Sequence, residues 1–153
     1  MAVASTHDNL AAYAGTASGL TSAALAGDAA AGKAGTLKLV TEEFMVPAVD
    51  PGINLYVRNK HPEGVKKFNS DNILLFVHGS TYPAETAFDL KLAGVSWMEF
   101  IAQHGYDVYL VDIRGYGRST RPPEMEQPAD QNEPIVRTET AVKDVGAAVD
   151  FIL

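Results

Sequence analysis

The stretch "ILLFVHGSTYPAE", from Ile73 to Glu85, decides the fold of this chain. Five large apolar residues run directly into His-Gly-Ser-Thr, and a polar loop containing Pro83 follows. A continuous apolar run of this length is typical of a strand that is covered on both faces, as in a parallel sheet packed between helices. The serine that follows this run, Ser80, raises the question of whether this strand presents a nucleophile.

The patterns around this strand predict an α/β sheet. Two expected strands, within 36–48 and 53–59, flank Asp50-Pro51-Gly52, which is typical turn chemistry and predicts an antiparallel hairpin. After the strand at 73–78 we expect, in order, a helix over 92–104 stopped by Gly105, a second buried strand over 106–112, a long proline-rich loop over 121–136 and a final helix. This order predicts an antiparallel hairpin followed by parallel strands with helices on both faces.

The two expected helices carry apolar faces. Helical spacing predicts that the first one turns Val95, Met98, Ile101 and Ala102 inward, and that Trp97, Phe100 and Met98 are core residues. The final helix is expected to start at a cap formed by Thr138 or Thr140 and to turn Val142, Val145, Val149 and Ile152 inward.

Composition excludes several classes of protein. The 153 residues carry a net charge of -7 and no Lys/Arg cluster, so nucleic acid is not an expected partner. The absence of cysteine excludes a disulfide scaffold, a thiolate metal site and a cysteine nucleophile. No apolar run approaches the roughly 20 residues that span a bilayer.

The first 35 residues differ from the rest of the chain. They are rich in Ala, Gly, Ser and Thr, and their first basic residue is Lys33. We expect residues 1–35 to be a flexible extension of a domain that occupies residues 36–153. A secretory signal places positive charge ahead of an apolar segment, which this stretch does not, so we expect a cytoplasmic protein and leave a secreted or periplasmic one open.

Two motifs lie at the expected carboxyl ends of the parallel strands, where functional loops of such sheets gather. They are "HGST" after Val77 and "DIRGYGRS" after Val111. Taken together over residues 36–153, they resemble the N-terminal portion of the α/β-hydrolase superfamily, in particular its bacterial esterase and lipase-like branch. The resemblance implies strand three with its His-Gly oxyanion loop, helix A, and strand four with its Asp-x-Arg-Gly-x-Gly-x-Ser turn.

The resemblance also implies roles for the residues of these motifs. The backbone N–H of Ser80 would donate to the oxyanion formed when an acyl carbonyl is attacked, with Thr81 as the neighbour that shares this role or the pocket. The other motif residues are expected to order the two loops: His78, Gly79, Asp112, Arg114, Gly115, Gly117 and Ser119. For Asp112 and Arg114 this means either a local charge pair or a set of turn-ordering contacts.

Neither Ser80 nor Ser119 lies in Gly-x-Ser-x-Gly, the pattern of a hydrolase nucleophile, and the chain contains no such pattern. Gly115 and Gly117 also fall short of a dinucleotide fingerprint, because prolines rather than a helix follow them. His61 and His104 are expected to be solvated or structural. We therefore expect no nucleophile in this chain, no cofactor and no metal.

The end of the chain supports a further expectation. The last helix runs into Phe151-Ile152-Leu153 without a glycine cap, a basic residue or a proline. In the resembled family this helix precedes strand five, which carries the nucleophile and pairs with strand three. We therefore expect an incomplete sheet, truncated before the nucleophile elbow, in which "ILLFV" is a bare edge and the isolated chain is marginal or prone to aggregate.

The expected function follows from these points. The parent protein would be a serine hydrolase that acts on a small-molecule carboxylic ester by acyl transfer, and the fragment itself would be inactive. Alternatives are a parent with dehalogenase or epoxide hydrolase chemistry, a noncatalytic α/β module, or one subunit of a split assembly. The oligomeric state stays open.

Overall fold

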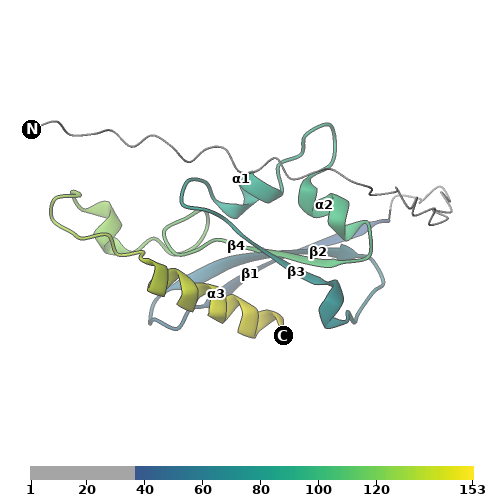
Figure 1. The fold of residues 1–153 in the computed structure, drawn as a ribbon, viewed down its shortest axis with the longest axis horizontal. Helices are drawn as coiled ribbons and strands as arrows, with labels where there is room; N and C mark the ends of the chain where they lie inside the picture. Colours follow the sequence, from purple (N-terminus) through teal and green to yellow (C-terminus); the bar gives the residue numbers. More distant parts are fainter. Residues whose placement is uncertain (1–36) are drawn as a thin grey trace, which may run out of the picture. The chain divides into compact units, whose positions relative to one another are not determined.

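The computed structural model describes residues 37–153, which form a four-stranded mixed sheet with helices on both faces (Figure 1). The extension expected over 1–35 lies outside the described residues. The strands are β1 (Leu39–Pro47), β2 (Asn54–Pro62), β3 (Ile73–Val77) and β4 (Asp107–Val111), in the order β1-β2-β4-β3. The α/β class, the hairpin and the parallel pair predicted from the sequence are confirmed.

The hairpin of β1 and β2 forms as expected. The two strands pair antiparallel from Leu39 opposite Pro62 to Pro47 opposite Asn54. The turn between them includes Gly52 at φ +79°, a conformation that glycine adopts without steric cost. β2 also pairs antiparallel with β4, so the hairpin is part of the four-stranded sheet.

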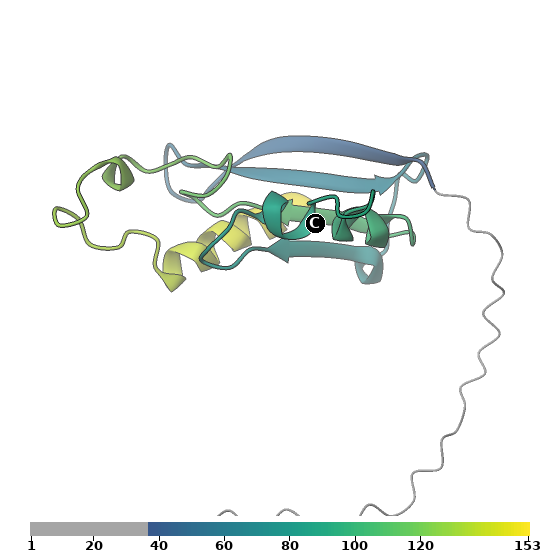
Figure 2. The same cartoon turned by 90° about the horizontal axis from the view of Figure 1, so that it is seen from above.

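β3 and β4 form the parallel pair. Their register runs from Ile73 opposite Asp107 to Val77 opposite Val111, so both strands end at the same level. β3 pairs with no second strand in the described part of the chain and forms one edge of the sheet (Figure 2). Within the described residues, "ILLFV" therefore forms an unpaired edge strand, as the sequence predicted.

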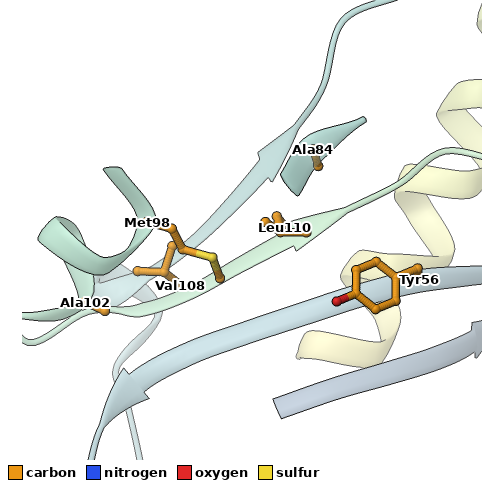
Figure 3. Close-up of a cluster of buried hydrophobic side chains, with 6 residues drawn as sticks. All are labelled: Tyr56, Ala84, Met98, Ala102, Val108 and Leu110. Carbon is orange, nitrogen blue, oxygen red and sulfur yellow. The ribbon is translucent and has the colours of Figure 1, made fainter. Parts of the chain in front are cut away.

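Short helices cover one face of the sheet. They are α1 (Ala84–Phe88) and α2 (Trp97–Ala102), and a 3₁₀ turn, η1 (Ser70–Asn72), precedes β3. The core under α1 and α2 is built from fully or almost fully buried side chains: Tyr56, Ala84, Met98, Ala102, Val108 and Leu110 (Figure 3). A longer helix, α3 (Thr138–Ile152), covers the opposite face and buries Ala148 against Leu55, Val57 and Val111.

The helix predicted over 92–104 is shorter than expected. It begins only at Trp97, because Ser96 caps it: the Ser96 hydroxyl accepts from the Glu99 N–H, and the Glu99 carboxylate accepts from the Ser96 N–H. Residues 92–95 instead form a tight turn, with Ala93 at φ 55° and Gly94 at φ 97°. The expected stop at Gly105 is confirmed by its φ of 92° and its N–H bond to the Ala102 carbonyl.

Some core predictions for the helices are wrong. Met98 is fully buried, but Trp97 is 58% exposed and Phe100 is 52% exposed. In α3, Val142 is 64% exposed, while Asp144 and Ala148 face the sheet. The expected threonine cap of α3 is also absent, because Arg137 occupies the cap position without a side-chain hydrogen bond.

The loop predicted between β4 and α3 is confirmed apart from one turn of 3₁₀ helix, η2 (Pro123–Glu126). Within residues 37–153, no helix combines the length and the apolar character that a membrane crossing requires.

Candidate active site

The candidate site lies where β3 and β4 end. Because the two strands are parallel and in register, the residues after Val77 and after Val111 leave the sheet side by side. The loop 78–83 and the turn 112–120 therefore meet at one end of the sheet. The structure thus brings the two sequence motifs together.

His78 connects the two motifs. Its Nε2 accepts a hydrogen bond from the Ile113 N–H at 3.0 Å, and its Nδ1 lies 2.6 Å from the Gly79 carbonyl oxygen. Since Nε2 accepts, Nδ1 carries the proton and donates it to that carbonyl. The ring also packs against Tyr116, with centroids 4.5 Å apart. Both nitrogens of His78 are thus engaged in holding the loop, and neither faces a serine hydroxyl.

Ser80 and Thr81 are exposed at the rim of the site. The Ser80 carbonyl accepts a hydrogen bond from the Tyr116 hydroxyl at 2.7 Å, which fixes the orientation of the loop backbone. Within residues 37–153, neither the Ser80 N–H nor the Thr81 N–H donates to a protein acceptor. These amides are therefore available to a bound oxygen atom.

A depression of about 250 Å³ lies against this loop. Its wall is formed by the end of β3, the turn after β4 and the first turn of α3: His78, Gly79, Ser80, Ile113, Tyr116, Val136, Arg137, Thr138 and Ala141. No hydroxyl in this wall lies within hydrogen-bond distance of a carboxylate or an imidazole nitrogen. Among the residues described, the depression is thus lined by Ser80, whose amide has no acceptor within residues 37–153, and by no activated nucleophile.

Ser119 is buried and fully engaged. Its Oγ accepts from the Tyr56 N–H at 2.8 Å and donates to the Asp112 carbonyl at 2.6 Å. Because its one proton is committed to a backbone oxygen, this hydroxyl ties the turn to β2.

Asp112 is 1% exposed and lies under the turn. Its Oδ1 accepts from the Ala84 N–H at 2.8 Å, and its Oδ2 accepts from the Arg118 N–H at 3.1 Å. This carboxylate therefore holds the first residue of α1 and the glycine turn together. Gly115 and Gly117, at φ 83° and 49°, allow the chain to fold around it.

Arg114 does not pair with Asp112, so the local charge pair that the sequence left open is not formed. Its guanidinium instead contacts Asp144 in α3, with Nη2 to Oδ1 at 2.5 Å, and Asp50 in the hairpin turn at 2.7 Å. The hydrogen bond to Asp144 outweighs burial and raises the pKa of Arg114. Asp144 was not predicted, because a carboxylate inside a helix thirty positions away gives no local signal.

A second charged cluster lies between β2 and the short helices, and sequence analysis missed it. Asp89, at the end of α1, accepts from Arg58 at 2.6 Å, from Lys60 at 2.7 Å and from the Ser96 hydroxyl at 2.6 Å. Burial opposes the charge on Arg58, but its hydrogen bonds to Asp89 and Glu43 prevail and raise its pKa. This cluster ties α1 and the cap of α2 to β2.

Tyr56 belongs to the same cluster. Its hydroxyl donates to Glu43 at 2.8 Å and accepts from the Arg58 Nε–H at 2.9 Å. Burial raises the pKa of Tyr56 to about 12, and the hydrogen bond from Tyr56 lowers the pKa of Glu43.

Within the described residues, no group of three or more His, Cys, Asp or Glu side chains has an arrangement that suits a metal ion.

Comparison with models of known protein families and with curated protein sequences found no match. Among solved structures, the chain is similar to a hypothetical protein from Pseudomonas aeruginosa, with 16% identity over 76% of this chain and 30% of that one and a TM-score of 0.47. It is similar to a post-proline cleaving enzyme from Rickettsia typhi, with 18% identity over 74% of this chain and 15% of that one and a TM-score of 0.48. A predicted CIB-like hydrolase from Thermoplasma acidophilum has 18% identity over 75% of this chain and 44% of that one, with a TM-score of 0.36.

The chain spans less than half of the length of each of these structures. Its own topology defines the class: an α/β protein with a four-stranded mixed sheet in the order β1-β2-β4-β3. The activity proposed below rests on the chain's own residues.

Proposed function

We propose that this chain is the N-terminal portion of a serine hydrolase that acts on carboxylic esters by acyl transfer. The observation that carries the proposal is the loop after β3, in which His78 and Tyr116 hold the backbone while the Ser80 amide stays free at the depression. In this proposal the loop supplies one half of an oxyanion hole.

The chemistry requires a donor of this kind. When a hydroxyl attacks an ester carbonyl, the carbonyl oxygen becomes an oxyanion in the tetrahedral intermediate. A fixed backbone N–H directed at that oxygen stabilises the transition state by roughly 3 kcal/mol. Ser80 would contribute through its backbone, and the neighbouring Thr81 amide or hydroxyl would contribute to the same pocket.

In this proposal, the nucleophile would lie at the end of a further strand of the sheet. In the resembled family that strand pairs with the strand corresponding to β3, which is an edge in the described residues. A strand paired there would end beside His78, Gly79 and Ser80, next to the depression. The acid and the histidine of the triad would follow later in the chain.

Two other functions are compatible with the same fold. An aspartate in place of the nucleophilic serine would make the parent a dehalogenase or an epoxide hydrolase. A noncatalytic α/β module, or one subunit of a split assembly, is favoured by the finding that no nucleophile and base meet within residues 37–153.

The coding sequence downstream of Leu153 distinguishes these functions. The proposal predicts Gly-x-Ser-x-Gly within roughly 25 residues, followed by Asp or Glu and then His. An aspartate at the central position would instead assign dehalogenase or epoxide hydrolase chemistry. A stop codon directly after Leu153 would contradict the proposal and favour the module or the split assembly.

A further inference from the structure

Consecutive peptide groups in the loop after β3 are held by different side chains. The Nδ1 of His78 donates to the Gly79 carbonyl at 2.6 Å. The Tyr116 hydroxyl donates to the next carbonyl, that of Ser80, at 2.7 Å. His78 belongs to the first sequence motif, whereas Tyr116 lies between the two glycines of the second motif, a position to which the sequence assigned no role.

Each of these carbonyls is coupled to an amide. A trans peptide group is planar, so its C=O and its N–H point in opposite directions and turn together. The Gly79 carbonyl shares its peptide group with the Ser80 N–H, so His78 fixes the direction of that amide. The Ser80 carbonyl shares its group with the Thr81 N–H, so Tyr116 fixes the direction of the second amide.

The tip of the loop has no other support among the described residues. Between the carbonyls of Gly79 and Pro83, the Ser80 carbonyl is the one backbone group that is hydrogen-bonded within residues 37–153. Residues 80–82 are also exposed, so packing does not restrain them. The orientation of the Ser80–Thr81 peptide group therefore depends on the Tyr116 hydroxyl.

This orientation decides the sign of the partial charge that the loop presents. If the Ser80–Thr81 peptide group turned over, its carbonyl oxygen would take the place of the Thr81 N–H. The donor would then be replaced by an acceptor, which repels a developing negative charge instead of stabilising it. An oxyanion loop thus requires that this peptide group be held before the reaction starts.

We propose that Tyr116 is a positioning residue of the oxyanion loop, and that it acts through the Thr81 amide. This inference rests on the proposed function and adds a division of roles to it: His78 orients the first donor, Ser80, and Tyr116 orients the second donor, Thr81. Tyr116 does not itself donate to the oxyanion, because its one proton is committed to the Ser80 carbonyl.

Tyr116→Phe isolates the hydroxyl. The phenyl ring can keep its packing against His78, at 4.5 Å between centroids, and the backbone bonds of Tyr116 to Ile113 and Ser119 do not involve the side chain. The lost hydrogen bond is exposed, so water can replace it and the unfolding midpoint should stay unchanged. Tyr106→Phe is the matched control, because Tyr106 is 37% exposed and precedes β4 at the opposite end of the strand.

Nitrogen-15 relaxation of the 153-residue chain gives the first measurement. In the unmodified chain we expect order parameters of about 0.85 for the Ser80 and Thr81 amides, as in rigid backbone. Tyr116→Phe should lower the value for Thr81 below about 0.6 and change the value for Ser80 much less, whereas Tyr106→Phe should change neither. An unchanged Thr81 value, or equal loosening of both amides, would overturn the proposal.

Ester hydrolysis by the longer protein that the proposed function predicts gives the second measurement. The oxyanion exists only in the transition state and the intermediate, so a misplaced donor should lower kcat and leave KM unchanged. We expect Tyr116→Phe to lower kcat by about 10- to 100-fold, and Tyr106→Phe to alter neither constant. A higher KM with unchanged kcat would show that Tyr116 only binds substrate, and would overturn the proposal.

The two measurements separate this inference from the proposed function. If the unmodified longer protein hydrolyses no ester, the proposed function fails, and the order parameters still decide whether Tyr116 holds the Thr81 amide. If that protein hydrolyses the ester and Tyr116→Phe keeps its full kcat, the proposed function stands and the role of Tyr116 is contradicted.

Discussion

The guanidinium of Arg114 and the carboxylate of Asp144 form a buried ion pair that joins the turn after β4 to α3. The Arg114 Nε and Nη2 reach the two carboxylate oxygens at 2.9 and 2.5 Å, and the Arg114 N–H also donates to Asp144 at 3.2 Å. Asp144 is fully buried and Arg114 is 7% exposed. Because α3 helps to form the wall of the depression, this pair sets the position of that wall.

Asp144→Ala should destabilise the fold by about 3–5 kcal/mol, because it leaves a buried guanidinium with only the contact to Asp50. Urea unfolding at a fixed protein concentration measures the loss. Asp150→Ala makes the same change at an exposed position of the same helix and should alter stability by no more than about 0.5 kcal/mol. Equal effects of the two substitutions would show that the ion pair does not hold α3.

Gly117→Ala should destabilise the turn after β4 through a steric clash. A Cβ at Gly117 would be placed directly on Oδ2 of Asp112, and the residue has φ +49°. Gly64→Ala is the matched control, because Gly64 also has a positive φ, +85°, but open space around its Cβ position. The control should cost about 1–2 kcal/mol for the backbone conformation alone. Gly117→Ala should cost about 1–3 kcal/mol more, measured by thermal or urea unfolding.

Glu99 makes the fold sensitive to acid. Burial opposes its charge, but hydrogen bonds from Lys91 and Lys60 outweigh burial and lower its pKa from 4.5 to about 2. A lowered carboxyl pKa contributes stability that is complete above pH 4.5 and is lost as the pH falls toward 2. Glu99→Gln should therefore be less stable at neutral pH and should lose less stability between these two pH values. Unfolding by urea across this range tests the prediction, with the exposed Glu124→Gln as control. Parallel pH curves for Glu99→Gln and the unmodified chain would contradict it.

The sheet could be predicted from the sequence because its strands carry local signals. The apolar run at β3, the Asp50-Pro51-Gly52 turn and the glycine at position 105 each act within a few residues, and each feature is present in the structure. The resemblance carried by the two motifs implied only that strand three lies at the edge once strand five is missing, and β3 is an edge strand in the described residues.

The helix boundaries and the buried charges could not be predicted in the same way. Leu92 and Val95 continue the helical spacing upstream of α2, but the capping box at Ser96 and the turn at Ala93 end that pattern. In β2, the alternation of Tyr56, Arg58 and Lys60 is typical of a solvated face. The structure buries Arg58 and Lys60 because Asp89, which follows α1, neutralises them from about thirty positions away. Ion pairs between residues about thirty positions apart leave no periodic pattern in the sequence.

Trp97, Phe100 and Val142 show a different limit. Their helical spacing predicted core positions, yet each of these side chains is more than half exposed. Hydrophobic spacing indicates which face of a helix is apolar, but it does not say which chain supplies the atoms that cover it.

The central claim, that the loop after β3 stabilises an oxyanion through its backbone, is tested most directly by comparing two substitutions at Ser80. The comparison uses the longer protein that the proposal predicts, with hydrolysis of a p-nitrophenyl ester as the measurement. Ser80→Ala keeps the N–H and should retain kcat, whereas Ser80→Pro removes the N–H and should lower kcat by about 10²–10³. Circular dichroism and the unfolding midpoint check that both variants fold. Equal activity of the two folded variants, or loss of activity in Ser80→Ala alone, would contradict the claim.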